Sequence, residues 1–257
     1  MIIIRAMCAR FVSRIMAAME RVVQVRWHDP FELLYNAAPS MQLSVVTAGE
    51  DAPEVRAMKW GFIPGWWTQA RPPKLTINTR SEEAPDKPMW RAAFRGARCL
   101  VPALGWYEWS TESRVDTRTG EIHEVRQPNF VHLDGLQPLA FAGLWSSWRP
   151  ERGAEPLLTF SILTRAAAPA LASLHDRMPV VLPESAYNEW LDPANDDVAA
   201  LSRMIETGSV TDLRHYPVGL YVNNPKNEGP KCIEPLTTAE PAGPLPPSLP
   251  FGDDKSG

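Results

Sequence analysis

The chain has 257 residues, of which 44% are hydrophobic and 22% are charged, and its formal net charge is −4. This length and composition are typical of one globular domain, with or without a tail. The negative net charge excludes a broad basic surface for nucleic acid, although it is compatible with a local basic site. No CxxC or HExxH motif occurs and the five histidines are scattered, so neither a metal site nor another cofactor is predicted.

Proline and cysteine usage narrow the class further. The 26 prolines favour short strands and turns over long helices. The three cysteines, Cys8, Cys99 and Cys232, are widely spaced and odd in number, which is typical of a reducing compartment without disulfides. The apolar run at residues 2–4 is too short for a signal peptide or a membrane span. We therefore expect a cytoplasmic protein that does not bind membranes.

Hydrophobic periodicity and turn residues predict the elements of the first half of the chain. These are an amphipathic helix over 13–23 capped by Ser13, a turn at 35–39, strands over 42–46 and 56–62, and a helix around 89–94. Pro64 and Gly65 force a turn that leaves Trp66 and Trp67 on a loop.

The second half has a stronger β pattern. The expected elements are strands over 98–102, 105–109, 121–126, 129–133, 139–145 and 157–164, a hairpin loop at 116–120, a helical turn at 168–173, and helices over 183–191 and 198–206. Residues 236–257 are rich in proline and lack periodicity, so we expect a disordered tail after a domain that spans 8–235. The predicted fold is α+β, with a mainly antiparallel, barrel-like β core and short flanking helices.

Glu108 is the first candidate catalytic residue. It lies between large aromatic residues in the segment 105–109 (GWYEW), on a predicted strand. Burial among aromatic side chains raises the pKa of a carboxyl group, which would make Glu108 a proton carrier near neutral pH. A glutamate on the solvent face of the strand is an equally good interpretation of this segment alone.

His175 lies on a predicted loop in the segment 174–179 (LHDRMP), beside Asp176 and Arg177. A loop histidine can act as a general acid or base, and an arginine two residues later is suited to phosphate. For this hexapeptide taken alone, a surface histidine without function is the more common interpretation.

Two pairs of residues suggest contacts with nucleic acid. Asn78 and Arg80 alternate along extended chain and therefore face one side, where an amide and a guanidinium suit a sugar–phosphate or peptide backbone. Trp66 and Trp67 could stack on unpaired bases. The structural alternatives are a solvated strand edge for the first pair and a hydrophobic lid for the second. Of the other cysteines, Cys99 and Cys232, the first is expected to be buried in a strand and the second to be incidental.

Cys8 has a chemistry that depends on where the mature chain starts. A cysteine that is the first residue carries an α-amine and a thiol on adjacent carbons, and this 1,2-aminothiol condenses with an aldehyde to a five-membered thiazolidine. The α-amine titrates at about 7.7–8.0 and a free thiol at about 8.5, so both are usable nucleophiles near neutrality. In the sequence as written, Met7 precedes Cys8 and blocks the amine.

Several segments together closely resemble the SRAP family, the SOS response-associated peptidases, also called abasic site processing proteins. In chain order they are 7–11 (MCARF), 35–39 (YNAAP), 60–64 (WGFIP), 78–80 (NTR), 98–102 (RCLVP), 107–109 (YEW), 175–179 (HDRMP), 215–218 (HYPV) and 222–229. The ordered set is highly specific and extends over residues 8–235.

The resemblance implies a single α+β domain with a cleft for single-stranded DNA. In it, Cys8 would form a thiazolidine with the ring-opened aldehyde of an abasic site and shield the lesion from strand cleavage. The implied catalytic residues are Cys8, Asn78, which orients the cysteine and the sugar, Glu108, which manages the amine proton and ring closure, and His175, which shuttles protons during ring opening and adduct reversal. The implied DNA contacts are Arg10, Trp66, Trp67, Arg80 and Arg177. The expected partner is single-stranded DNA that contains abasic sites, bound by a monomer without metal or cofactor at the nucleoid.

The sequence departs from the family pattern at a few positions. Ala9, Thr79 and Leu104 replace a glycine, an alanine and an acidic residue that are common there. The larger departure is the leader at 1–7, which we expect to be absent from the mature protein, because Met7 is the true initiator or because the leader is removed by self-cleavage.

Two alternative functions remain open from the sequence. The first is a cysteine peptidase that uses Cys8 with His175 as its base and Glu108 or Asn78 as the orienting residue. The family's peptidase name fits this alternative, although removal of the residues ahead of the cysteine also accounts for the name. The second is a non-catalytic single-stranded DNA binder that relies on the tryptophans and arginines.

Overall fold

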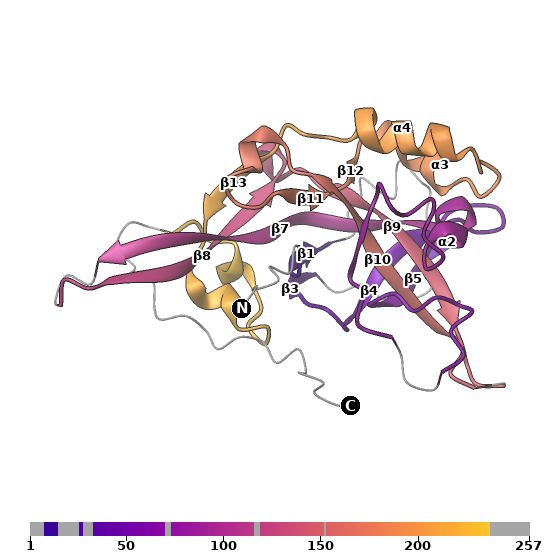
Figure 1. Ribbon diagram of the computed structural model, residues 1–257, viewed down its shortest axis with the longest axis horizontal. Helices are drawn as coiled ribbons and strands as arrows, with labels where there is room; N and C mark the ends of the chain where they lie inside the picture. Colours follow the sequence, from indigo (N-terminus) through magenta and orange to yellow (C-terminus); the bar gives the residue numbers. More distant parts are fainter. Residues whose placement is uncertain are drawn as a thin grey trace.

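A computed structural model of the chain describes residues 8–14, 26–27, 33–69, 73–115, 119–151 and 153–236 (Figure 1). The leader at 1–7, most of the helix predicted over 13–23, and residues 237–257 of the tail lie outside this range. Ser13 itself is the last residue of a strand and does not cap a helix. No helix in the described part of the chain is long and apolar enough to cross a membrane.

Within these residues the strands form one sheet of thirteen. They are β1 Phe11–Ser13, β2 Arg26–Trp27, β3 Leu34–Ala37, β4 Gln42–Thr47, β5 Glu54–Trp60, β6 Asn78–Arg80, β7 Arg98–Val115, β8 Ile122–His132, β9 Leu139–Trp148, β10 Leu157–Ala166, β11 Arg177–Pro179, β12 Val181–Leu182 and β13 Arg214–Pro217. The α-helices are α2 Arg91–Gly96, α3 Tyr187–Leu191 and α4 Val198–Gly208. The 3₁₀ turns are η1 Asp134–Leu136, η2 Pro169–Leu171, η3 Glu184–Ala186, η4 Leu220–Asn223 and η5 Pro230–Cys232.

Five strands make the core barrel-like, because their pairings form a closed circuit in the order β9, β10, β5, β4, β7 and back to β9. The pairs are antiparallel except for β10 with β5. Two seams of the circuit are short: β4 meets β7 only from Val46 to Thr47, and β10 meets β5 only from Thr159 to Phe160. The core is therefore barrel-like without being a regular barrel, and the predicted α+β, mainly antiparallel fold is confirmed.

Large aromatic side chains fill the inside of this circuit. Phe11 lies edge-on to Trp60 and Phe141, with ring centroids 5.1 and 5.7 Å apart, and Trp60 stacks on Phe160 at 6.3 Å. Each ring buries roughly 150–250 Å², which at about 25 cal/mol per Å² corresponds to an upper limit of about 4–6 kcal/mol. Cys8 belongs to the same buried cluster, so the start of the described chain is part of the core.

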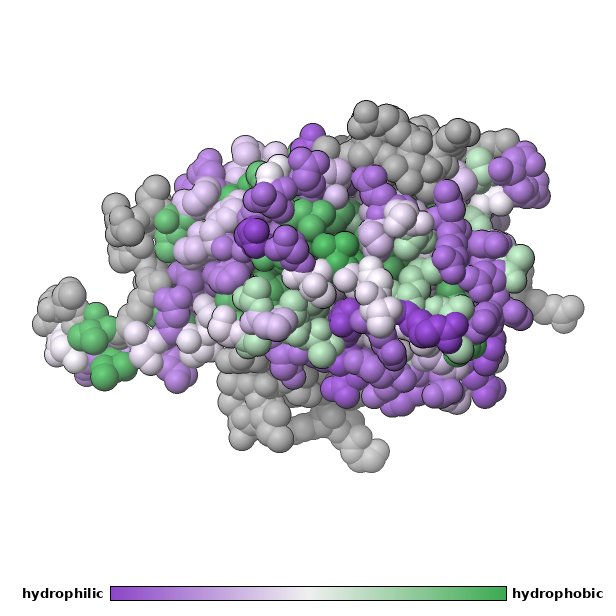
Figure 2. Space-filling model, turned by 90° about the horizontal axis from the view of Figure 1, so that it is seen from above, coloured by the Kyte–Doolittle hydropathy of each residue, from purple (hydrophilic) through white to green (hydrophobic). Residues whose placement is uncertain are grey.

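The helices cover the other face of the sheet (Figure 1). Phe94 of α2 packs against Trp190 of α3 at 6.1 Å, and Leu201 and Ile205 of α4 join the same cluster. The buried Arg98 donates to the carbonyl oxygens of Phe94 and Trp190 at 2.8 and 2.7 Å, which ties two of the helices to the start of β7. Seen from the side of these helices, the surface has an apolar middle bordered by hydrophilic residues (Figure 2).

The prediction of two short strands over 98–102 and 105–109 is wrong, because both segments lie in the single strand β7. Gly105 does not turn the chain. A Cβ there would lie 2.3 Å from the carbonyl oxygen of Val131, so the glycine permits a close approach of β8. Pro102 lies opposite Ala140 in the ladder with β9, and on the other edge of β7 it falls between the parts that pair with β4 and with β1.

Two further predictions are corrected. The strands expected over 121–126 and 129–133 are one strand, β8, and together with β7 it forms a hairpin that projects from the sheet (Figure 1). The turn expected at 35–39 begins inside β3, which pairs with β1. The helix expected over 183–191 is divided into η3 and the shorter α3, and residues 116–118 of the expected hairpin loop lie outside the described range. The remaining predicted strands and helices in that range occur where they were expected, with small shifts at their ends.

Candidate active site around Cys8

The pairing of β1 with β7 brings Cys8 to Glu108. Phe11 lies opposite Trp106, and the backbone N–H of Tyr107 donates to the carbonyl oxygen of Arg10 at 3.0 Å. Continuing this antiparallel register places the chain ahead of β1 beside Glu108. There the backbone nitrogen of Cys8 donates to Oε1 of Glu108 at 2.9 Å.

The contact between Cys8 and Glu108 is buried and locally strained. Cys8 is fully buried and Glu108 is 4% exposed, so the interpretation of Glu108 as a solvent-facing residue is wrong. Cys8 also has a φ of 39°, in the left-handed region that residues with a side chain rarely adopt. The hydrogen bond to Glu108 offsets part of this strain and fixes the direction of the Cys8 nitrogen.

Burial controls the protonation of both partners. It raises the pKa of Glu108 to about 8, against the opposing effects of the Cys8 hydrogen bond and the charge of Arg126, and the charge of Asp176 adds to the rise. Burial, followed by the charge of Glu108, also raises the pKa of the Cys8 thiol well above its ordinary value. At neutral pH the thiol is therefore uncharged, and Glu108 can both hold and release a proton.

His175 lies on the loop between β10 and β11, close to this pair. Leu171 and Leu174 of the loop belong to the buried cluster that contains Cys8, and the influence of Asp176 on Glu108 indicates that the loop is near the carboxyl. His175 Nδ1 lies 3.0 Å from the backbone nitrogen of Arg177 and 2.8 Å from Oδ1 of Asp176. The first contact requires an unprotonated Nδ1 and the second a protonated one, so the ring has a partner in either protonation state.

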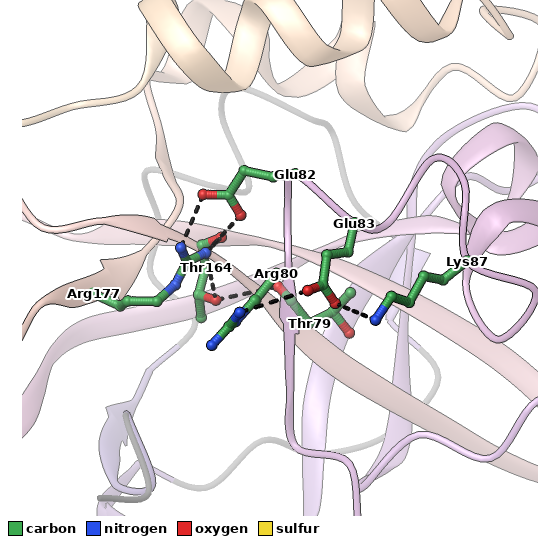
Figure 3. Close-up of polar contacts among 7 residues, drawn as sticks. All are labelled: Thr79, Arg80, Glu82, Glu83, Lys87, Thr164 and Arg177. Carbon is green, nitrogen blue, oxygen red and sulfur yellow. Dashed lines mark hydrogen bonds and ion pairs between the residues drawn. The ribbon is translucent and has the colours of Figure 1, made fainter.

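Arg177 is held by a carboxylate on its outer edge and a carbonyl on its inner edge (Figure 3). Its Nη1 and Nη2 donate to the two oxygens of Glu82 at 2.9 and 2.7 Å, and Nη2 also donates to the carbonyl of Thr164 at 2.6 Å. Burial raises the pKa of Glu82, but the hydrogen bonds and charge of Arg177 outweigh it, and the net effect is a lowered pKa. Glu82 is therefore an anion at neutral pH.

Asn78 and Arg80 lie on β6, which pairs in parallel with β10 and places Arg80 opposite Thr164. Thr79 between them is buried, and its hydroxyl lies 2.7 Å from that of Ser161, so the threonine at this position has a hydrogen-bond partner of its own. Arg80 points the other way, with 63% of its side chain exposed, and pairs with Glu83 at 3.6 Å. The alternation expected of extended chain is thus present, and Arg80 remains accessible to a ligand.

Residues 7–225 match the family described as SOS response associated peptidase (SRAP). The chain belongs to the SRAP family. The abasic site processing protein YoqW of Bacillus subtilis (strain 168) is 33% identical over 200 residues, which cover 78% of this chain and 85% of that protein. The abasic site processing protein HMCES of Xenopus tropicalis is 28% identical over 236 residues, which cover 84% of this chain and 70% of that protein.

Solved structures share the SRAP fold. A phage-related protein from Bordetella bronchiseptica is 29% identical, with a TM-score of 0.62 over 82% of this chain and 94% of that one. A protein from Bacteroides thetaiotaomicron superposes with a TM-score of 0.65 over 79% of this chain and 85% of that one, at 21% identity, which bears on the fold alone.

Arg10, which the SRAP resemblance assigned to DNA, is buried and bonded to the protein. Its guanidinium donates to Oδ1 of Asn36 at 2.6 Å and to the carbonyl oxygens of Val222 and Asn223 at 3.1 and 3.3 Å. A phosphate contact would have to compete with these bonds, so the DNA contact of Arg10 stays a prediction. The sequence reasoning missed the partner Asn36, whose side chain also donates to the carbonyl of Asn224 at 3.0 Å.

Trp66 and Trp67 differ in their environments. Trp66 is 56% exposed and Trp67 is partly buried, with ring centroids 6.1 Å apart. The carbonyl of Trp67 accepts a hydrogen bond from the indole of Trp148 at 2.7 Å, which anchors the loop to β9. Of the two rings, Trp66 is therefore the one that faces solvent.

Cys99 and Cys232 are the other two cysteines of the chain, and both are buried. Cys99 is buried in β7, as expected, and Cys232 is buried in η5, so it is a packed core residue and not an incidental one. Among the described residues, no group of histidine, cysteine, aspartate and glutamate side chains could hold a metal ion.

Proposed function

We propose that the mature protein begins at Cys8 and captures abasic sites in single-stranded DNA as a covalent thiazolidine. The observation that carries this proposal is the 2.9 Å hydrogen bond from the Cys8 nitrogen to a buried carboxyl group with a pKa of about 8. In a chain that starts at Cys8, the same nitrogen is the α-amine. The names of the curated relatives supply the lesion class.

In the reaction, the nitrogen and the sulfur of Cys8 each form a bond to the same carbon of the lesion. The α-amine adds to the aldehyde carbon of the ring-opened sugar to give a carbinolamine, and loss of water leaves an imine. The thiol then adds to the imine carbon, its proton passes to the nitrogen, and the five-membered ring closes. Water is the only by-product, and no oxidant or reductant is needed.

Glu108 is suited to the proton transfers in this sequence. In its protonated form it can donate to the departing hydroxyl of the carbinolamine, and in its ionised form it can accept the proton of the thiol. The thiol needs such a base, because burial keeps its own pKa high. A charged α-amine would lower the pKa of Glu108 below its value beside an amide, which favours proton exchange within the pair.

The remaining candidate residues surround the lesion in this proposal. Asn78 orients Cys8 and the sugar, His175 moves protons during ring opening and reversal, and Arg80 and Arg177 hold the flanking phosphates. Trp66 and Trp67 wedge against neighbouring bases, and Arg10 supports the site in addition to any phosphate contact. The half-exposed Trp66 and the exposed Arg80 are the most accessible of these groups.

A cysteine peptidase has less support. Such an enzyme needs a thiolate, and thiols become thiolates beside cations or a paired histidine. Around Cys8, burial and the carboxylate of Glu108 both act in the opposite direction. Removal of the leader at 1–7 would be a single event of maturation and does not require peptidase activity on other proteins.

The test uses two forms of the protein, one that begins at Cys8 and one in which residues 1–7 are retained, both verified by intact mass. Each is mixed with single-stranded DNA that carries one abasic site and analysed on a denaturing gel. We expect a stable adduct, lighter than the sum of its parts by one water, only from the form that begins at Cys8. An adduct of equal yield from the form with the leader would refute the aminothiol mechanism, and binding without any adduct would favour the non-catalytic alternative.

A further inference from the structure

A row of charged residues continues from Arg177 along the turn that leads to α2 (Figure 3). Glu82 pairs with Arg177 at 2.7 Å, and its neighbour Glu83 pairs with Arg80 at 3.6 Å and with Lys87 at 3.0 Å. Ion pairs thus link these two carboxylates to a cation of β11, a cation of β6 and a cation of the turn. In Figure 3 the three basic side chains follow one another from Arg177 through Arg80 to Lys87.

Backbone hydrogen bonds extend the row onto α2. The N–H of Lys87 donates to the carbonyl of Glu83 at 3.0 Å, and the N–H of Arg91 donates to the carbonyl of Lys87 at 2.9 Å. Within α2, Arg91 and Arg95 are four residues apart, so they are neighbours on one side of that helix, with Cβ atoms about 5–6 Å apart. Ala93 and Phe94 of the same helix are buried, so α2 packs on the core while Arg91 and Arg95 face away from it.

The basic residues on the α2 side of this row are exposed, and two of them have no ion-pair partner. Lys87 has 55% of its side chain exposed, and Arg91 and Arg95 are exposed as well. Among the described residues, neither Arg91 nor Arg95 has an ion-pair partner. In a chain with a net charge of −4, two neighbouring unpaired arginines next to Lys87 and Arg80 are a local exception and indicate a polyanionic ligand.

We propose that Lys87, Arg91 and Arg95 form a phosphate track for the single strand that runs on from the lesion. The proposal rests on the proposed function of the Cys8 site and extends its DNA contacts past Arg80. Continuity with Arg80 and Arg177 favours a DNA backbone over an acidic protein, because a strand held by those arginines would pass directly onto the track. Its regular four-residue spacing also suits a repeating charge.

The experiment compares the protein that begins at Cys8 with its Arg91→Ala/Arg95→Ala variant and with Arg203→Ala as a control. Arg203 is an exposed arginine on α4, a helix that packs on the same buried cluster as α2. Binding is measured by fluorescence anisotropy at several salt concentrations, on abasic strands of about 5 and about 20 nucleotides, which bracket the usual size of a single-strand site. Thermal unfolding checks that both variants are folded.

On the long strand we expect the double variant to bind about 3–10-fold more weakly, and its salt slope to fall by about 1.4, because each phosphate contact on a single strand contributes about 0.7. On the short strand, and in the yield of adduct at saturating DNA, it should match the unmodified protein. Equal binding of the long strand by all three proteins, or an equal loss on both strands, would overturn the track. Loss of the adduct in the unmodified protein would instead overturn the function of the Cys8 site, so the two failures are distinguishable.

Discussion

Two glutamates of this protein, Glu108 and Glu82, each hold a residue that the SRAP resemblance marks as functional, and they do so in opposite electrostatic states. Glu108 is buried, accepts a hydrogen bond from the Cys8 nitrogen, and has its pKa raised to about 8. Glu82 is half exposed, binds both ends of the Arg177 guanidinium, and has a lowered pKa. At neutral pH Glu108 can therefore hold or release a proton, whereas Glu82 is ionised.

The two pKa values shift in opposite directions because the carboxyl groups differ in their hydrogen-bond partners and in their exposure to water. A single backbone N–H offsets only part of the cost of burying a carboxylate, whereas a bidentate guanidinium at the surface more than offsets a smaller cost. A glutamate side chain can therefore transfer protons at one position, and hold or neutralise a neighbouring cation at another. This distinction gives three predictions, which differ in size.

The largest effect is expected from Glu108→Gln, which keeps the shape of the side chain and removes its proton. In the protein that begins at Cys8, formation of the adduct should slow by about 10²–10⁴-fold, the usual contribution of a positioned acid–base group. Noncovalent binding to single-stranded DNA should change little. Rapid sampling on denaturing gels measures the rate, and Glu82→Gln, which affects no proton transfer, is the matched control. Equal rates of adduct formation in the two variants would mean that Glu108 contributes no more to the reaction than Glu82 does.

The second prediction concerns stability against pH in the form that retains residues 1–7. Because the folded pKa of Glu108 lies above the ordinary value of 4.5, its protonated form stabilises the fold below about pH 4.5, and this contribution is lost as the pH rises through 8. Over that window the unmodified protein should lose roughly 4 kcal/mol relative to Glu108→Gln. Urea unfolding of both proteins at pH 5, 6.5 and 8 measures the difference.

A matched comparison sharpens this result. In the protein that begins at Cys8, the charged α-amine would favour the ionised carboxyl, so the pH-dependent difference should shrink. For Glu82→Gln the dependence should have the opposite sign and lie below about pH 4.5, since a lowered pKa contributes stability above the ordinary value that is lost on acidification; between pH 5 and 8 this variant should show no pH-dependent difference. A difference between Glu108→Gln and the unmodified protein that does not change with pH would mean that Glu108 is ionised in the fold.

The sequence could nominate the candidate residues of this site but not their contacts. The order of the motifs pointed to Cys8, Glu108 and His175, but the segment around Glu108 could not show whether its side chain was buried. Alternation along a strand separates a wet face from a dry one only when one face is open, and residues 101–108 of β7 are buried on both faces.

The residues that the arginines contact could not be predicted from the local sequence either. Arg177 meets Glu82 across 95 residues, and Arg10 meets Val222 across 212 residues. Each contact is set by the pairing of strands, and each changes what the arginine can bind. The strand boundaries were mispredicted for a related reason, because Pro102 and Gly105 are turn residues in most contexts. Here Pro102 falls between the parts of β7 that pair with β4 and with β1, and Gly105 permits the close approach of β8.

The smallest effect is expected from Glu82→Gln on DNA binding. Glu82 occupies the outer edge of the Arg177 guanidinium, so a phosphate must displace it to reach that edge, while the carbonyl of Thr164 keeps the guanidinium in place. A half-exposed ion pair is worth about 0.2–1 kcal/mol, so its removal should raise the affinity for a single strand by about 1.4–5-fold. Glu83→Gln, at the longer 3.6 Å pair with Arg80, should have a smaller effect. Salt titrations by anisotropy distinguish the outcomes, because removing a carboxylate beside the strand should also steepen the salt dependence. Weaker binding by Glu82→Gln, comparable to that of Arg177→Ala, would mean that Glu82 positions the arginine for phosphate and does not compete with it.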